Sequence, residues 1–269
     1  MKYEGLLAET VVIRGHNGDK IDAYFARPLG PGPHPSVVLI HHMPGWDEAS
    51  KEMARKLAYH GFATISPNLH FREGKSTPQE NSTSVREAGG MPDDRTLGDV
   101  EGSMDFLRSQ ANSNGKVGVI GFCSGGRQTY LVACRLAGVD AAVDCWGGGV
   151  TQGNDSLSER MPEWPVNFTA SLNCPLLGLF GEEDGRPSPA DVSETEEALK
   201  KHGKTYEFHM YPGAGHGFFA VDRPSYHQES AVDGWEKVLA WFGRHLSSDA
   251  AAEGAKADRV GAAVPAGDS

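Results

Sequence analysis

The 269-residue sequence has few cysteines, no long apolar run and no excess of basic residues. None of its four cysteines forms a CxxC pair, which argues against a zinc site or a redox motif, and a reducing cytosol would not favour disulfides. No segment approaches the roughly 18 apolar residues of a membrane helix. The first nine residues lack the apolar core of a signal peptide. We therefore expect a cytoplasmic protein without a membrane partner.

Acidic residues outnumber basic ones, 36 Asp and Glu against 25 Lys and Arg, for a formal net charge of -11. Nucleic acids and anionic membranes are bound by clusters of Lys and Arg, so we expect a small-molecule substrate and no nucleic acid. The length and the 39% hydrophobic content suit one large core, which predicts one domain over residues 1–246. The Ala- and Gly-rich composition of residues 247–269 predicts a disordered tail. For the oligomeric state, the sequence allows either a monomer or a dimer.

Short β-rich runs alternate with helical patterns along the chain. This alternation predicts an α/β fold with a mostly parallel, eight-stranded sheet covered by helices on both faces. The expected strands are residues 10–14, 21–27, 36–42, 62–66, 116–121, 141–146, 175–181 and 205–211. The expected helices are residues 48–60, 94–109, 127–136, 189–201 and 226–245. Residues 72–93 and 147–173 are expected to be loops, either solvated surface or walls of a pocket.

Residues 121–126, Gly-Phe-Cys-Ser-Gly-Gly, have the pattern of a nucleophile elbow. In that turn a strand reverses sharply into a helix, and glycines must flank the apex because a Cβ would collide with the neighbouring backbone. Cys123 stands at the apex, where the N-terminus of the following helix would favour its thiolate. The alternative is a glycine-rich turn that holds an ordinary buried cysteine. Cys134, Cys145 and Cys174 are expected to be core thiols.

The partners of such a nucleophile follow it in chain order, on loops after later strands. Asp184 fits the position of the acid, directly after the strand at residues 175–181. Glu182 and Glu183 are rivals, expected instead to be exposed turn residues. His216 follows the strand at residues 205–211 in a glycine-rich loop and is the expected base.

An oxyanion hole needs one backbone donor from the residue after the nucleophile and one from the loop after the third strand. These positions select the backbone N–H groups of Ser124 and Met43.

The adjacent histidines His41 and His42, with Asp47 and Glu48 nearby, raise the alternative of a metal site. Neighbouring side chains on an extended strand point to opposite faces, and no motif places a third ligand. We therefore expect no metal.

At these motifs the sequence resembles the dienelactone hydrolase (carboxymethylenebutenolidase) family, over about residues 5–246. The resemblance is strongest in residues 113–126, 181–184 and 214–218. It implies the α/β hydrolase fold without a cofactor. It also implies that Cys123 is the nucleophile, His216 its base and later acid, and Asp184 the residue that orients the imidazole.

By this resemblance the expected reaction is hydrolysis of an activated ester or lactone through a thioester on Cys123. A broad carboxylesterase or thioesterase of the same fold is the alternative. A noncatalytic relative of the fold and a metal-dependent enzyme are further hypotheses.

Two positions depart from typical family members. His42 stands where they have a glutamate after the third strand, so it could either stabilise the thiolate as a cation or form a neutral wall of the pocket. Typical members also hold a substrate carboxylate with two arginines. The first could be Arg72, Arg86 or Arg95 here, and Ala220 occupies the second position with Arg223 nearby. The candidates for substrate binding or activation are His42, Trp46, Arg86, Phe122 and Trp146.

Overall fold

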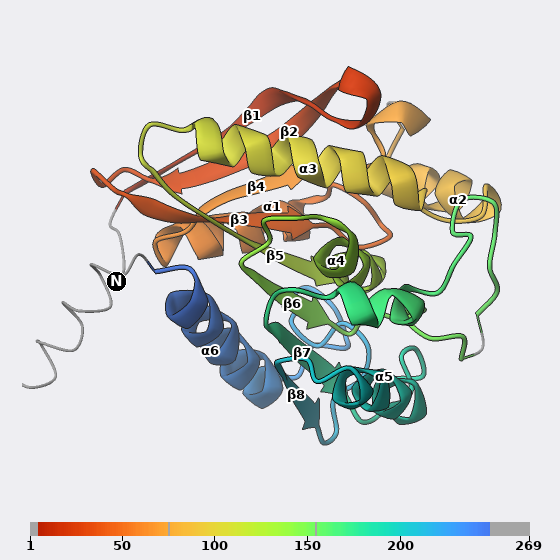
Figure 1. Cartoon of the computed structure of the whole chain (residues 1–269). Helices are drawn as coiled ribbons and strands as arrows, with labels where there is room; N and C mark the ends of the chain where they lie inside the picture. The colour runs from red at the N-terminus through yellow and green to blue at the C-terminus, as the bar shows by residue number, and fades with distance from the viewer. Residues whose placement is uncertain (1–4, 75, 154, 248–269) are drawn as a thin grey trace, which may run out of the picture.

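The computed structural model describes residues 5–74, 76–153 and 155–247. Within these residues one sheet contains eight strands in the order β1-β2-β4-β3-β5-β6-β7-β8 (Figure 1). The strands are β1 (Leu6–Arg14), β2 (Lys20–Pro28), β3 (His34–Ile40), β4 (Ala63–Pro67), β5 (Ser113–Phe122), β6 (Ala141–Cys145), β7 (Leu176–Gly181) and β8 (Tyr206–Tyr211). β2 pairs antiparallel with β1 and with β4, and the pairs from β4 through β8 are parallel. The prediction of an eight-stranded, mostly parallel sheet is confirmed.

The helices cover both faces of this sheet. They are α1 (Glu48–Tyr59), α2 (Pro78–Glu87), α3 (Asp93–Ser109), α4 (Ser124–Arg135), α5 (Pro189–Lys201) and α6 (Gln228–His245). Alternate residues of β3 enter two different apolar clusters, because successive side chains of a strand point to opposite faces. Val37 belongs to the cluster that includes residues of α1 and α6, and Val38 belongs to the cluster that includes residues of α3, α4 and α5. None of the described helices is long and apolar enough to cross a membrane.

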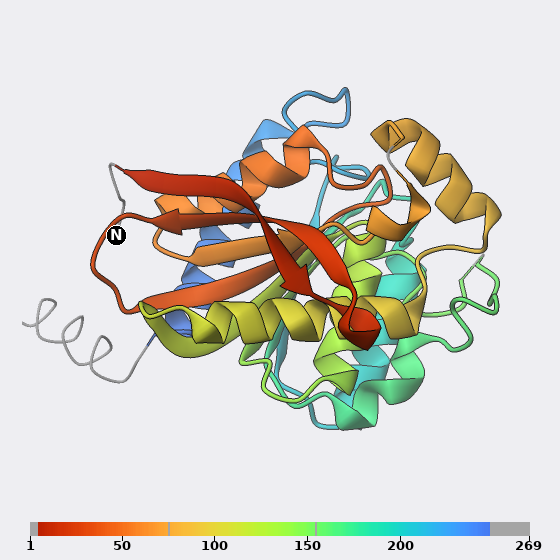
Figure 2. The same ribbon diagram turned by 90° about the horizontal axis from the view of Figure 1, so that it is seen from above.

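Residues 72–93, expected to be a loop, contain the helix α2. The Thr77 hydroxyl accepts a hydrogen bond from the backbone N–H of Glu80, and the Glu80 carboxylate accepts one from the backbone N–H of Thr77. This capping box satisfies two N–H groups that a helix start leaves without partners. Figure 2 shows α2 at the edge of the molecule, with the hairpin of β1 and β2 nearest the viewer.

The second expected loop, residues 147–173, contains a short 3-10 helix, Pro165–Ser171. The tail predicted for residues 247–269 lies, apart from Ser247, outside the described residues.

Candidate active site

Cys123 lies at a sharp turn between β5 and α4, with φ 56° and ψ -120°. A side chain rarely adopts this left-handed backbone conformation, and here it reverses the chain within one residue. A Cβ on Gly121 would lie 2.0 Å from the Gly125 carbonyl oxygen, and one on Gly125 would lie 2.2 Å from the Ile40 carbonyl oxygen. The flanking glycines therefore permit the close backbone approach that the elbow pattern predicts.

The structure brings Asp184 and His216 together at the ends of β7 and β8. Nδ1 of His216 donates to Oδ2 of Asp184 over 2.8 Å. The Asp184 side chain is buried, and its Oδ1 accepts from the backbone N–H of Arg186. Glu182 and Glu183 are exposed, as expected. The buried, doubly hydrogen-bonded carboxylate fixes the imidazole ring in one orientation.

A hydrogen bond also joins His216 to Cys123, so the three side chains form one chain of contacts. Burial opposes ionisation of the thiol, but the bond and charge of His216, the backbone N–H of Ser124 and the charge of Arg186 together lower the pKa of Cys123. Burial likewise opposes protonation of His216, yet its bonds to Asp184 and Cys123 raise the pKa of the imidazole. Both shifts favour a thiolate beside an imidazolium.

The other three cysteines have the opposite electrostatics. All three are buried, and burial raises the pKa of Cys134 and of Cys174 to about 12. Burial also raises the pKa of Cys145 well above its ordinary value. Thiols with such pKa values are poor nucleophiles at neutral pH.

Cys123 lines two cavities. The first, here called the catalytic cavity, has a volume of about 660 Å³. It is lined by His42, Pro44, Ala49, Ser50, Met53, Arg86, Phe122, Cys123, Trp146, His216, Gly217, Ala220 and Arg223. Phe122 and Trp146 are packed against each other with ring centroids 5.6 Å apart, which makes one wall of this cavity aromatic.

The second, here called the polar cavity, has a volume of about 880 Å³ and includes Met43, Ser124, Gln128 and Arg186 among its lining residues. The buried Oγ of Ser124 and Oε1 of Gln128 have no hydrogen-bond partner within the described part of the chain. A bound group with matching donors and acceptors would satisfy both atoms.

The loop after β3 lies against the first turn of α4. A Cβ on Gly125 would lie within 2.6 Å of the carbonyl oxygens of Ile40 and His41, so the two segments are in close contact. Met43, two residues further on, lines the polar cavity with Ser124. The two residues expected to supply oxyanion donors thus border the same space beside Cys123.

His42 and His41 point in different directions. His42 lines the catalytic cavity, and its Nε2 lies 2.6 Å from Oδ2 of Asp47. His41 is buried, with Nδ1 bonded to the carbonyl of His42 and Nε2 accepting from the backbone N–H of Leu69. Among residues 5–74, 76–153 and 155–247, no three His, Cys, Asp or Glu side chains lie together as a metal site would require.

Trp46 does not reach Cys123. Its Nε1–H donates to the carbonyl of Ser66, and the ammonium of Lys51 lies 4.3 Å from its ring centroid. These contacts hold the indole in a separate cavity that includes His70, and Trp46 is not among the residues that line the two cavities beside Cys123.

Of the three candidate arginines, only Arg86 faces the site, where it borders both cavities. Arg72 forms ion pairs with Asp19 and Asp99, and Arg95 pairs with Glu73. Arg223 and Ala220 line the catalytic cavity.

Arg186, which was not among the residues expected at the site, stands two residues after Asp184 and lines the polar cavity. Arg186 lies in the same loop as Asp184, and this closeness in the sequence could have indicated that it lies near the site.

A model of the dienelactone hydrolase family matches residues 21–246. The chain belongs to this family. A protein of Escherichia coli (strain K12) named "Putative carboxymethylenebutenolidase" is 37% identical over 232 residues, which cover 84% of this chain and 83% of that protein. A Bradyrhizobium protein named "Probable 2-oxo-3-(5-oxofuran-2-ylidene)propanoate lactonase" is 30% identical over 235 residues, covering 86% of this chain and 92% of its own.

Among solved structures, one titled "Putative Dienelactone Hydrolase" from Klebsiella pneumoniae has a TM-score of 0.80 and 34% identity. It covers 89% of this chain and 99% of its own. The family member described here is therefore a hydrolase with the α/β hydrolase fold, as the resemblance of its motifs implied.

Proposed function

We propose that this dienelactone hydrolase family member hydrolyses activated esters or lactones through a Cys123, His216 and Asp184 triad and a thioester intermediate. The single observation that carries the proposal is the continuous chain of hydrogen bonds from the Cys123 thiol through the His216 imidazole to the buried Asp184 carboxylate. The lowered pKa of the thiol increases the fraction of Cys123 that is present as the nucleophilic thiolate.

In the first half of the reaction the Cys123 thiolate attacks the carbonyl carbon, and the C=O electron pair moves onto oxygen. The backbone N–H groups of Met43 and Ser124 stabilise this oxyanion. When the tetrahedral intermediate collapses, the bond to the leaving oxygen breaks, and the His216 imidazolium gives its proton to that oxygen. The acyl group remains on sulfur as a thioester.

In the second half the now neutral His216 removes a proton from water, which attacks the thioester carbonyl. Asp184 stabilises the imidazolium that forms and keeps its Nε2 directed toward the reaction. Release of the Cys123 thiolate yields the carboxylic acid and restores the ion pair.

A thiolate is a good leaving group, so the tetrahedral intermediate returns to substrate unless the alcohol side leaves readily. Enols and phenols meet this condition, which favours enol lactones and aryl esters over simple alkyl esters. Arg86 and Arg223 border the catalytic cavity and are suited to bind a substrate carboxylate. A broader carboxylesterase or thioesterase activity is the second candidate, supported by the apolar wall of Phe122 and Trp146.

The test is a panel of a dienelactone, 4-nitrophenyl acetate and a thioester assayed with the wild-type protein and Cys123→Ala. We expect hydrolysis by the wild type, with a thioester trapped by mass spectrometry, and no turnover by the variant. Full activity of Cys123→Ala would refute the proposed mechanism. Comparable rates on all three compounds would favour the broader enzyme.

A further inference from the structure

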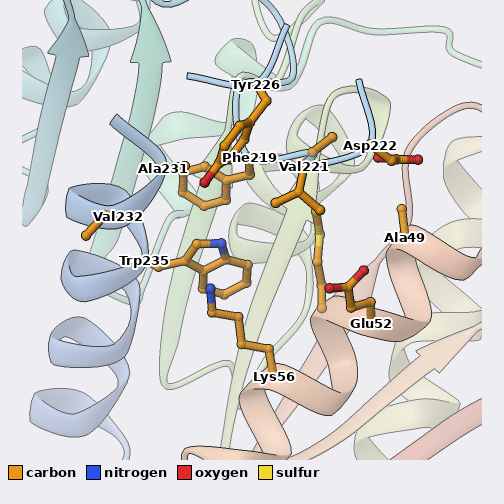
Figure 3. Close-up of a pocket in the computed structure, with 12 residues that line it drawn as sticks. Ala49, Glu52, Lys56, Phe219, Val221, Asp222, Tyr226, Ala231, Val232 and Trp235 are labelled. Carbon is orange, nitrogen blue, oxygen red and sulfur yellow. The ribbon is translucent and has the colours of Figure 1, made fainter. Parts of the chain in front are cut away.

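Beside the catalytic cavity lies a second apolar space, here called the aromatic groove, between α1, α6 and the chain at residues 219–226. Its volume is about 540 Å³. The rings of Phe219 and Trp235 stack with centroids 5.1 Å apart, and both side chains are buried. Figure 3 shows these two rings beside α6, with Lys56 reaching toward the indole from α1. The groove is therefore an aromatic wall with a charged edge.

Apolar side chains of this groove are unusually open to solvent. Val221 is 63% exposed, Val232 53% and Tyr226 37%, three of the eight large hydrophobic residues exposed in the described part of the chain. Isolated exposed apolar residues are ordinary on a protein surface. Several of them around one concave, aromatic site indicate a binding site for an apolar group.

The groove adjoins the catalytic cavity. Ala49, Met53 and Ala220 line both spaces. Two of these side chains are single methyl groups, and the third is the unbranched, adaptable methionine, so the partition between the spaces is low. One elongated molecule can occupy both.

The reacting groups decide which end of an ester would enter the groove. His216 lines the catalytic cavity and not the polar one, whereas Met43 and Ser124 line the polar cavity and not the catalytic one. The leaving oxygen must reach His216 to receive a proton, and the carbonyl oxygen must reach the backbone donors of Met43 and Ser124. The leaving alcohol therefore occupies the catalytic cavity, and the acyl side faces the polar cavity.

From this we infer that the aromatic groove is a subsite for an extended, neutral aromatic leaving group, such as a substituted phenol, whose distal ring packs against Phe219 and Trp235. The inference rests on the proposed function and adds the chemical class of the alcohol to it. Aromatic and aliphatic side chains line the groove together with Glu52, Lys56 and Asp222, and neither Arg86 nor Arg223 is among its lining residues.

The kinetic test compares kcat/KM for phenyl acetate with that for biphenyl-4-yl acetate, whose leaving phenol has similar acidity and one more ring. We expect the wild type to prefer the biphenyl ester about tenfold, the effect of burying part of that ring. The variant Val221→Glu with Val232→Glu places two charges in the groove at exposed positions and should abolish this preference. The control, Val12→Glu with Leu29→Glu, adds the same charge at two exposed positions outside the groove and should retain it.

An ester with a longer acyl group tests the opposite orientation, in which the groove binds the acyl side of the substrate. If the Val221 and Val232 double variant instead lowers activity selectively on phenyl octanoate, the groove binds the acyl side and the inference is wrong. An unchanged preference for the biphenyl ester in that variant would also overturn it. If light scattering then showed loss of self-association, the occupant would be a second copy of the chain.

A binding measurement separates failure of the subsite from failure of the triad. With Cys123→Ala as the background, 4-phenylphenol should quench tryptophan fluorescence, and adding Val221→Glu and Val232→Glu should weaken its binding about tenfold. Turnover that persists in Cys123→Ala would refute the triad while leaving this result intact. An affinity for 4-phenylphenol that the two glutamates leave unchanged would refute the subsite alone.

Discussion

The Nε2 atom of His42 lies 2.6 Å from Oδ2 of Asp47, and this carboxylate also accepts the backbone N–H of Ser50 as the N-cap of α1. Burial opposes ionisation of Asp47, but these contacts lower the pKa of its carboxyl. The charge of His42, when protonated, is thus paired with Asp47. The groups that lower the pKa of Cys123 are His216, Ser124 and Arg186. The geometry favours His42 as a wall of the pocket.

We therefore predict that His42→Ala leaves the pH midpoint of Cys123 alkylation by iodoacetamide unchanged and alters the relative kcat/KM among ester substrates. Alkylation rates measured from pH 5 to 9 provide the check. A midpoint that rises in the variant would show instead that a cationic His42 stabilises the thiolate.

Removal of His216 should have the opposite effect on alkylation. Because its hydrogen bond and charge lower the pKa of Cys123, His216→Ala should raise that pKa and slow alkylation at pH 6 far more than at pH 9. Mass spectrometry should locate the label on Cys123 before Cys134, Cys145 or Cys174. Glu183→Gln, an exposed acid in the same region, is the control and should retain the wild-type pH profile. A wild-type profile in His216→Ala would contradict the ion pair.

Asp184 and His216 should behave as one unit in catalysis. We expect Asp184→Asn to lower kcat by about 10²- to 10⁴-fold, because the imidazole loses its orienting carboxylate. The double variant with His216→Ala should be little slower than His216→Ala alone. Steady-state kinetics of the four proteins measures this coupling. Effects that multiply would show that the two residues act separately.

Asp144 predicts a pH dependence of stability that is independent of catalysis. Its side chain is 1% exposed on β6, and burial raises its pKa to about 7, partly opposed by a hydrogen bond from the Gly147 backbone N–H. Between about pH 4 and pH 7 the Asp144 carboxyl is ionised in the unfolded chain but still protonated in the folded chain. The free energy of unfolding therefore falls as the pH rises.

Relative to Asp144→Asn, the wild-type free energy of unfolding should therefore fall by about 4 kcal/mol from pH 4 to pH 7 and change little above that. Urea unfolding of both proteins at pH 5 and pH 8 tests this. A constant difference between them would mean that the carboxyl titrates normally.

A buried ion pair connects α3 to α4. The Arg127 guanidinium binds both carboxylate oxygens of Asp93 over 2.5 and 3.1 Å, and Gln128 Nε2 donates to the same carboxylate. Arg127→Met should destabilise the protein by about 3–5 kcal/mol because it leaves a buried carboxylate without its cation. Adding Asp93→Leu should recover much of that loss in urea unfolding. If the single variant matched the wild type, water would have to reach Asp93.

The sequence predicted the regular parts of the molecule well because they depend on local patterns. The turn of glycines around Cys123 and the chain order of Asp184 and His216 are constraints that a single sequence displays. The helix α2 was missed although Thr77 and Glu80 form a capping box that can be seen in the sequence. Its polar composition concealed a helix that is held at its first turn by side-chain caps.

The lining of the cavities could not be predicted to the same extent. Trp46 is close to Met43 in sequence, yet its indole N–H donates to the carbonyl of Ser66 in β4, a contact that depends on how the strands are arranged in the sheet. Arg86 and Arg186 are 100 residues apart in the sequence, and Arg223 lies 37 residues beyond Arg186. Only the fold brings the three to one site. Ion pairs away from the site engage other arginines, such as Arg72, which pairs with Asp99.

The backbone at Cys123 has a consequence for how this enzyme can change under selection. Serine differs from cysteine only in the atom beyond Cβ, so the elbow can exchange sulfur for oxygen with no displacement of the chain. A methyl group on Gly121 or Gly125 would instead overlap a carbonyl oxygen at about 2 Å and move a strand or a helix. In a library of random variants, a single-nucleotide change can therefore exchange the proposed nucleophile Cys123 for serine, while Gly121 and Gly125 should tolerate no larger residue.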